Sequence, residues 1–243
     1  MVNATDNGVL DRVIESMREP IRQFTGLVRH LAGGNTKGLT LYGAIVAGSF
    51  DAKRQSARSI LVFETVDLEV LREFATHGTK LGQVAIAAPL IMTPRYIERS
   101  LDTYPLELIE ISQQHLTIFG DDYFRDLTFE KAHVRIQCER ELKGLLIGMR
   151  QGLLNAAGRE AIISALEVDL AEVLVRTLRG MLWLDGSREA IPAIAVVERV
   201  EELTNRRLPG ARAAVNPNAQ HGWEEFQLLY RDIEALGDVA DGW

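Results

Sequence analysis

A glycine-serine pair with basic residues behind it is the part of this sequence best suited to chemistry. Gly48 and Ser49 follow the apolar stretch LTLYGAIVA, and Lys53, Arg54 and Arg58 come soon after them. Backbone N–H groups at a glycine that opens a helix bind anions, and basic side chains strengthen that binding. The segment therefore predicts a phosphate site; the alternative is a solvated basic loop.

Few carboxylates lie where they could bind a metal ion beside this segment. Asp51 lies in the loop itself, and Glu64 lies late in the next apolar stretch, so neither is expected to form a metal site. Glu107 and Glu110 lie in the stretch LELIEI, which we interpret as a strand. Because a strand alternates its side chains, at most one of them faces a given site. The alternative for either is a solvated or N–H-paired glutamate.

The other polar groups suggest structural roles. Asp121 and Asp122 follow a glycine and are expected to cap a turn or a helix. The five histidines have no spacing that places two on one helix face for zinc, and the single cysteine, Cys138, is expected to be a buried thiol. The Walker A, G-x-G-x-x-G and G-x-S-x-G patterns are absent. The sequence therefore predicts no metal site.

Two types of hydrophobic pattern divide the chain. The first half mixes helical spacing with short β-branched stretches, whereas only helical spacing occurs from Phe129 onward. The expected elements are helix 9–31, strands 39–47 and 59–65, helix 67–74, strand 83–92, a short helix from Pro94, strands 106–111 and 116–119, and helices 130–155, 159–184, 188–204 and 222–236.

We therefore expect an α+β protein with an α+β domain over residues 1–128, which includes an N-terminal helix, and a helical domain over residues 129–243. The sheet of the first domain is expected to be mixed and flanked by helices. Met181–Leu184 and Ala193–Val197 are apolar enough to form the core of the helical domain. A contact between copies in a homo-oligomer is the alternative for these two segments.

The order of these elements resembles the nucleotidyltransferase superfamily, which has the DNA-polymerase-β-like fold. In that family a Gly-Ser pair opens a short helix that holds the terminal phosphates, and a strand reading Ser-Asp-x-Asp follows. Gly48-Ser49 matches the first feature, and Ser56-Ala57-Arg58-Ser59 falls on the second. Two aspartates at i and i+2 point to one face of a strand, where they hold two Mg²⁺ ions that stabilise phosphoryl transfer.

Both aspartates are replaced in this sequence. Ala57 has no ligand atom, Ser59 offers only a neutral hydroxyl, and Arg58 adds positive charge. The resemblance implies a third carboxylate from a later strand, for which Glu107 is the candidate remnant. A shift of one residue in the loop before this strand would place the two aspartate positions elsewhere.

Later segments resemble a bacterial branch of the same superfamily. In that branch a Pro-Leu-Glu strand and an aromatic-Gly-Asp turn precede a long Gln-x-Glu-x-Glu-Leu helix. Pro105-Leu106-Glu107, Phe119-Gly120-Asp121 and the segment from Gln137 to Leu142 match these three features. The resemblance covers about residues 39–152 and, more loosely, the helical remainder.

The composition of the chain indicates which classes of partner it is unsuited to bind. Lys and Arg number 27 against 34 Asp and Glu, and the net charge of −7 argues against a surface that holds nucleic acid by charge. No apolar run approaches the ~20 residues of a membrane helix, and the N-terminus lacks a secretion pattern. We therefore expect a cytoplasmic protein that binds neither nucleic acid nor membrane.

The sequence predicts a pseudoenzyme, a nucleotidyltransferase-fold protein that acts as a binding or interaction module. The expected ligand is a nucleotide or another small phosphate compound, and no cofactor is expected. The alternative is an active nucleotidyltransferase that uses Mg²⁺ at an atypical site to transfer a nucleoside monophosphate to a small molecule or protein. A homo-oligomer with a purely structural role is a third hypothesis.

Overall fold

The computed structural model describes residues 8–48, 50–216, 218–219 and 221–243, and the chain forms two compact units. The first unit consists of Met1–Leu101 and Ile111–Leu127, and the second of Asp102–Glu110 and Thr128–Trp243. This division differs from a single boundary after residue 128, because a short segment that precedes the boundary belongs to the second unit.

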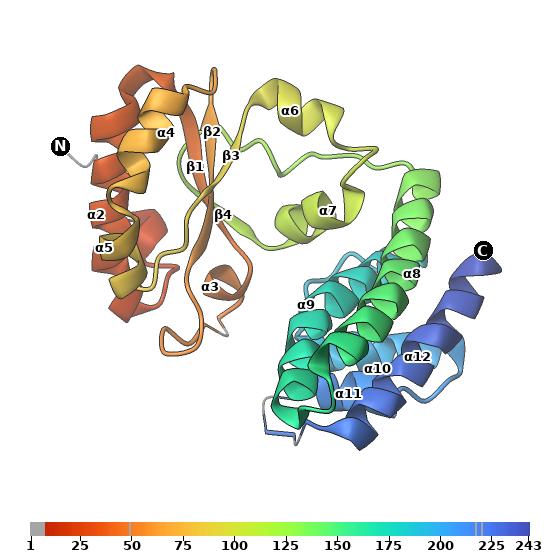
Figure 1. The fold of residues 1–243 in the computed structure, drawn as a ribbon. Helices are drawn as coiled ribbons and strands as arrows, with labels where there is room; N and C mark the ends of the chain where they lie inside the picture. Colours follow the sequence, from red (N-terminus) through yellow and green to blue (C-terminus); the bar gives the residue numbers. More distant parts are fainter. Residues whose placement is uncertain (1–7, 49, 217, 220) are drawn as a thin grey trace. The chain divides into compact units, whose positions relative to one another are not determined.

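A four-stranded sheet forms the centre of the first unit, with strand order β3-β2-β1-β4 (Figure 1). The strands are β1 (Thr36–Tyr42), β2 (Arg58–Phe63), β3 (Leu90–Met92) and β4 (His115–Gly120). β1 pairs antiparallel with both β2 and β4, and β2 pairs parallel with β3. The strand predicted over 39–47 ends at Tyr42, and its last residues form α3 instead. Of the strand predicted over 83–92, only Leu90–Met92 is a strand.

The helices of the first unit are α2 (Glu15–Ala32), α3 (Ala44–Ala47), α4 (Leu68–Ala75), α5 (Gly78–Gln83) and α6 (Pro94–Arg99). Two predicted helix starts are confirmed. Asp67 accepts a hydrogen bond from the backbone N–H of Glu69 at 2.9 Å, and Thr93 accepts one from that of Tyr96 at 3.1 Å. Such caps satisfy N–H groups that have no partner within the helix.

One face of the sheet packs against α2. The core between them contains Leu39 and Leu41 from β1, Leu61 and Phe63 from β2, and Ile21, Phe24 and Val28 from α2, all at most 1% exposed. Burial of each such side chain contributes roughly 1.5–3 kcal/mol. This face of the sheet is therefore closed to ligands.

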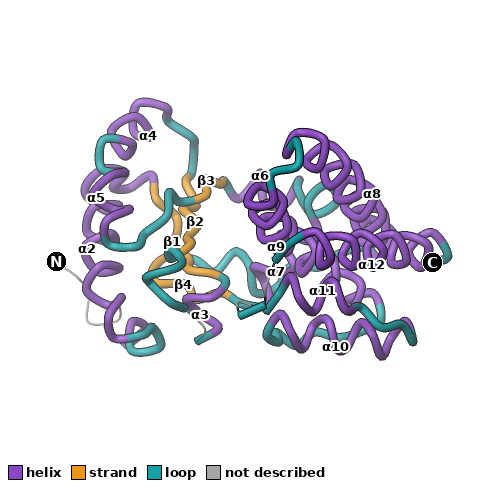
Figure 2. Tube along the Cα trace, turned by 60° about the horizontal axis from the view of Figure 1, so that its bottom comes forward, coloured by secondary structure: helices purple, strands orange, loops and turns teal. Residues whose placement is uncertain are grey.

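The second unit is helical (Figure 2). Its helices are α8 (Lys131–Ala156), α9 (Glu160–Leu184), α10 (Ala193–Thr204), α11 (Pro209–Ala214), α12 (Trp223–Asp241) and the first turns of α7 (Pro105–Gln113). The placement of Met181–Leu184 and Ala193–Val197 in the core is confirmed at Met181, Val196 and Val197, which are fully buried.

The predicted strand over 106–111 is wrong, because these residues belong to α7. Pro105 occupies the first helical position, which suits a residue without an N–H group. Leu106 and Ile109, three residues apart, both contribute to the core of the second unit. A short apolar run fits a strand or a buried helix equally well, and in this chain packing against α8 and α9 selects the helix.

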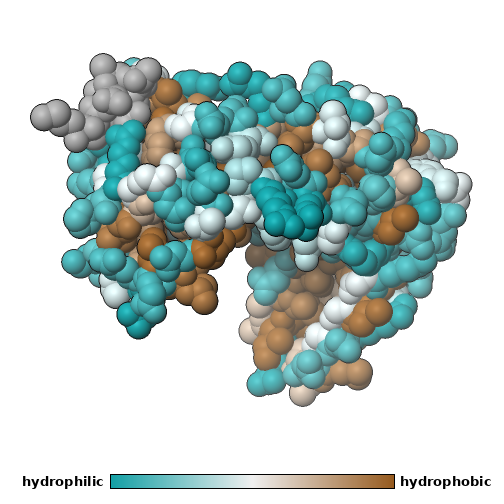
Figure 3. Space-filling model, turned by 90° about the horizontal axis from the view of Figure 1, so that it is seen from above, coloured by the Kyte–Doolittle hydropathy of each residue, from teal (hydrophilic) through white to brown (hydrophobic). Residues whose placement is uncertain are grey.

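The surface mixes polar and apolar side chains. Figure 3 shows hydrophilic residues over much of the face in view, together with groups of adjoining hydrophobic residues. Leu68 and Leu154 are the most exposed of the large apolar residues. Isolated apolar residues are common on protein surfaces and do not by themselves indicate an interface. Within the described ranges, no helix has the length and apolar character needed to cross a bilayer.

Candidate functional site

The turn from β1 into α3 is formed by a glycine with a positive φ. Gly43 ends the strand with φ 75° and ψ −144°, a conformation that residues with a Cβ rarely adopt. Its N–H donates to the carbonyl of Gln114 at 3.1 Å, and its carbonyl accepts from Val46 at 2.9 Å. A Cβ at this position would lie 3.1 Å from Nη2 of Arg58, so close approach by that side chain also favours glycine.

This turn replaces the one predicted at Gly48 and Ser49. Gly48 does not open a helix but ends α3, where it adopts the left-handed conformation with φ 75° and ψ 8°. Ser49 lies outside the described residues. The strand-glycine-helix arrangement is instead formed by Gly43 and Ala44, and Ala44 has no hydroxyl group. The signal was present in the sequence, because a glycine inside a strand-like run marks a bend or a close approach.

Ala57 and Ser59 share one face of β2, but that face is closed. Ser59 pairs with Leu41 of β1, and Ala57 belongs to the same core against α2. Both residues are 2% exposed, and the Ser59 hydroxyl has no hydrogen-bond partner in the described structure. Carboxylates at these positions would be buried among apolar side chains, where ionisation is strongly unfavourable. The two predicted aspartate positions therefore do not face a site.

The opposite face of the sheet carries a polar row at the end near Gly43. Tyr42 pairs with Arg58 on β2 and with His115 on β4, so these three residues lie side by side across the strands. The guanidinium carbon of Arg58 lies 5.3 Å from the centre of the Tyr42 ring, which is a cation-π contact. Arg58 is thus a predicted phosphate-binding residue whose side chain the structure brings against the Gly43 turn.

His115 extends this row through a carboxylate. Its Nε2 lies 2.9 Å from Oδ1 of Asp122, and its Nδ1 lies 3.0 Å from the carbonyl oxygen of Ile111. Asp122 also accepts from the backbone N–H of Phe124 at 3.1 Å, which confirms its predicted turn-capping role. The imidazole is thereby fixed in orientation. The pairing was not predicted, because β4 and the turn after it bring the two residues together only in the folded chain.

Asp51, Lys53 and Arg54 lie together in the exposed loop between α3 and β2. The Asp51 carboxylate accepts from the backbone N–H of Lys53 at 2.9 Å and lies 3.8 Å from Nε of Arg54. The carboxylate thus offsets part of the positive charge of the loop. Phosphate binding by Lys53 and Arg54 stays a prediction.

Glu107 and Glu110 lie on one face of α7 rather than on opposite faces of a strand. Glu107 pairs with Arg176 of α9 at 2.8 Å and accepts from Nε2 of Gln137 at 2.8 Å. Glu110 pairs with Arg179 of α9 at 3.2 Å. These carboxylates are occupied by bonds within the second unit, and they tie α7 to the helical core.

The residues present do not fit the Mg²⁺ ions that the resemblance implies. Within residues 8–48, 50–216, 218–219 and 221–243, no three His, Cys, Asp or Glu side chains group so as to hold a metal ion. At the Gly43 turn the guanidinium of Arg58 lies 3.1 Å from the position of an added Cβ, and its positive charge repels cations and attracts anions. The arrangement suits binding of an oxyanion.

Comparison with known proteins identifies the fold. The chain is similar in structure to the spectinomycin adenyltransferase AAD(9) from Enterococcus faecialis, solved with ATP and spectinomycin. The similarity covers 92% of this chain and 98% of that chain, with a TM-score of 0.58 and 12% identical residues. No protein-family model and no curated protein matches the sequence. The chain therefore has a nucleotidyltransferase-like fold.

Proposed function

We propose that this protein is a catalytically inactive member of the nucleotidyltransferase fold that binds a nucleotide or a related phosphate compound without a metal ion. The observation that carries the proposal is the position of Arg58, whose guanidinium lies over Tyr42 and against the Gly43 turn. A guanidinium presents paired N–H donors that match two phosphate oxygens.

The register of β2 supports loss of catalysis. Arg58 lies between Ala57 and Ser59 and points to the opposite face of the sheet, beside Tyr42. The two aspartate positions of the family pattern therefore hold a buried alanine and a buried serine hydroxyl, with a cation between them. A hydroxyl and a cation cannot replace two carboxylates as ligands of a hard divalent ion. Ala44 likewise removes the serine that follows the glycine in the family pattern.

The structural neighbour supports the choice of ligand. Spectinomycin adenyltransferase was solved with ATP, so a nucleotide is the ligand class that this fold accommodates in that protein. In this chain the guanidinium of Arg58 places positive charge beside the Gly43 turn. We infer that this charge binds the phosphate groups of the ligand directly, without Mg²⁺.

Thermal unfolding with ATP tests the proposal, because a ligand that binds the native state raises its Tm. We expect ATP to raise the Tm equally in Mg²⁺ and in EDTA, with no release of pyrophosphate in either buffer. Arg58→Gln should abolish the shift. Arg72→Gln, which removes an exposed cation from α4, is the matched control and should retain it.

Each other result contradicts the proposal in a recognisable way. A shift that requires Mg²⁺, or pyrophosphate release that depends on Mg²⁺, would establish the active nucleotidyltransferase instead. No shift with ATP, GTP, CTP, UTP or inorganic phosphate would indicate a protein that uses this fold for protein contacts alone. Each shift is measured against the same variant without ligand, so a change in the stability of Arg58→Gln itself does not affect the result.

A further inference from the structure

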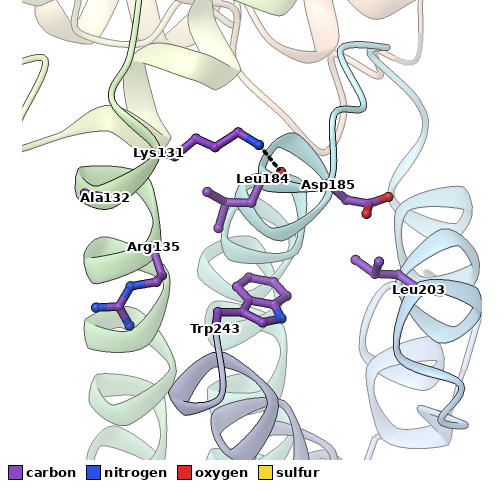
Figure 4. A pocket seen from close by; sticks show the side chains of 7 residues that line it. All are labelled: Lys131, Ala132, Arg135, Leu184, Asp185, Leu203 and Trp243. Atoms are coloured by element: carbon purple, nitrogen blue, oxygen red, sulfur yellow. Dashed lines mark hydrogen bonds between the residues drawn. The ribbon is translucent and has the colours of Figure 1, made fainter.

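A pocket in the helical unit has no part in the function proposed above. It has a volume of about 340 Å³ and lies where α8 begins and where α9 and α12 end (Figure 4). Leu184, Leu203 and Ala132 supply apolar wall, and the indole of Trp243 supplies a flat aromatic surface. This volume is at the small end of the range for ligand pockets.

Lys131 is one of two positive groups that line this pocket, the other being Arg135. Its ammonium donates to the carbonyl of Leu184 at 3.2 Å, so the side chain is held across from α8 to the end of α9 (Figure 4). An ammonium has three N–H donors, and this carbonyl takes one and carries no formal negative charge. The remaining donors are able to bind an anion beside the apolar wall.

The other charged residues of the pocket do not cancel this charge. Arg135 makes an ion pair with Glu139 at 3.2 Å, and Glu139 is shared with Lys143. The Asp185 carboxylate points away from Trp243, whereas the side chains of Leu184 and Leu203 point toward the indole (Figure 4). The first turn of α8 adds the positive end of a helix dipole near Lys131.

We propose that this pocket binds a small aromatic carboxylate, with the ring against Trp243 and the carboxylate on Lys131. The aromatic surface and apolar walls favour a flat ring over an aliphatic chain, because offset stacking adds to simple burial. The single ammonium favours one carboxylate over a phosphate, which carries more charge than this site balances. The pocket lies wholly within the second unit and does not depend on the Gly43 turn.

Isothermal titration calorimetry with three related probes tests this assignment. Indole-3-acetate carries the ring and the carboxylate, indole-3-acetamide is its neutral analogue, and tryptamine carries a positive charge. We expect indole-3-acetate to bind with a submillimolar Kd, the amide to bind about tenfold more weakly, and tryptamine not to bind. Raising the salt concentration to about 0.5 M should weaken binding of the acid and not of the amide.

Three variants locate the site. Lys131→Gln should weaken binding of indole-3-acetate about tenfold and leave binding of the amide unchanged. Trp243→Ala should weaken both, and Arg206→Gln, which removes an exposed cation just beyond α10, should change neither. Lys131 and Trp243 are exposed, so these variants are expected to fold, and their Tm values check this.

Several results would overturn the assignment. Equal affinities for indole-3-acetate and indole-3-acetamide would show that the Lys131 ammonium does not bind the carboxylate of the ligand. If indole-3-acetate at up to about 10 mM gave no heat of binding, or if its Kd were unchanged in Lys131→Gln, binding at this pocket would be excluded. The Tm shift with ATP should be the same in Lys131→Gln and in the wild type, which separates this test from that of the Gly43 turn.

Discussion

Leu41 and Ser59 lie directly opposite one another where β1 pairs with β2, and Leu41 belongs to the core against α2. Residues that face each other in an antiparallel pair point to the same side of the sheet. Ser59 therefore points into the core against α2, and Arg58 points to the opposite face of the sheet. A slip of one residue along β2 would exchange the two faces, and with them every conclusion about which positions can hold a ligand.

The first prediction restores carboxylates on each face of β2 in turn. Ser56→Asp combined with Arg58→Asp should create Mn²⁺ binding, because two carboxylates at positions i and i+2 would then lie where β2 begins, near the Gly43 turn. Ala57→Asp combined with Ser59→Asp should bind no Mn²⁺ and should lower the free energy of unfolding by more than about 3 kcal/mol, since both charges would be buried. Electron paramagnetic resonance of Mn²⁺ and urea unfolding measure the two effects.

The neutral pair Ser56→Asn with Arg58→Asn serves as the control and should bind no Mn²⁺. If the Ala57 and Ser59 double variant folds and binds Mn²⁺, then those two positions face the ligand site and Arg58 does not.

The second prediction concerns two glycines within long helices. Gly180 of α9 is buried, and an added Cβ would lie 2.8 Å from Sγ of Cys138 and would also meet Leu106. Gly144 of α8 has nothing within 4 Å of an added Cβ. Gly180→Ala should therefore destabilise the protein by about 1–3 kcal/mol. Gly144→Ala should stabilise it by about 0.5–1 kcal/mol, because alanine favours the helix.

Urea unfolding of the two variants measures this difference. Both substitutions add the same methyl group to a helix. Changes of opposite sign in the free energy of unfolding can therefore come only from the surroundings of the two glycines. A stabilising effect of Gly180→Ala would show that α7 does not pack against α9 as described.

The third prediction is a pH dependence of stability. Asp232 of α12 is buried and accepts from the backbone N–H of Ala211 at 2.9 Å. Burial raises its pKa to about 6 from the ordinary 3.8, although the backbone N–H groups of Ala211 and Gly210 oppose the rise. The stability that this group contributes is therefore full below about pH 4 and is lost as the pH rises through about 6.

Asp232→Asn should remove this dependence, because its neutral amide cannot ionise and keeps an oxygen for Ala211. Relative to the wild type, the variant should gain on the order of 2–3 kcal/mol between about pH 4 and pH 7. Urea unfolding across this range measures the difference. Asp238→Asn removes an exposed charge from the same helix, and its curve should stay parallel to that of the wild type.

The fourth prediction tests the role of Glu107. Its carboxylate pairs with Arg176 and accepts from Gln137, so we expect a structural effect within the second unit. A double-mutant cycle with Glu107→Gln and Arg176→Gln should give a coupling energy of about 0.5–1 kcal/mol, because both side chains are partly exposed. A coupling near zero, together with a loss of ATP binding in Glu107→Gln, would instead favour the predicted remnant of a catalytic carboxylate.

Local signals made some elements predictable from the sequence. Asp67 and Thr93 were recognisable as helix caps because a cap depends on residues only two or three positions away. The long periodic stretches that became α8 and α9 were also recognisable, since many turns repeat the same pattern. The fold class follows from these elements and is confirmed.

Elements and sites that depend on distant contacts could not be predicted in the same way. The run from Leu106 to Ile111 reads as a strand until packing against α8 and α9 is known. Gly43 and Gly48 are both plausible turns, and only the pairing of β1 with β2 and β4 shows where the strand ends. The contact between His115 and Asp122 likewise depends on the turn after β4.

The short segment Asp102–Glu110 also determines the order in which the protein can be completed during synthesis. β4 follows this segment in the chain, so the sheet lacks its last strand until the ribosome has passed residue 120. Leu106 and Ile109 share a core with α8 and α9, so they remain unpacked until these two helices have been synthesised. A chain ending at residue 128 would therefore expose both apolar side chains, and it should aggregate or recruit chaperones where the full-length chain does not.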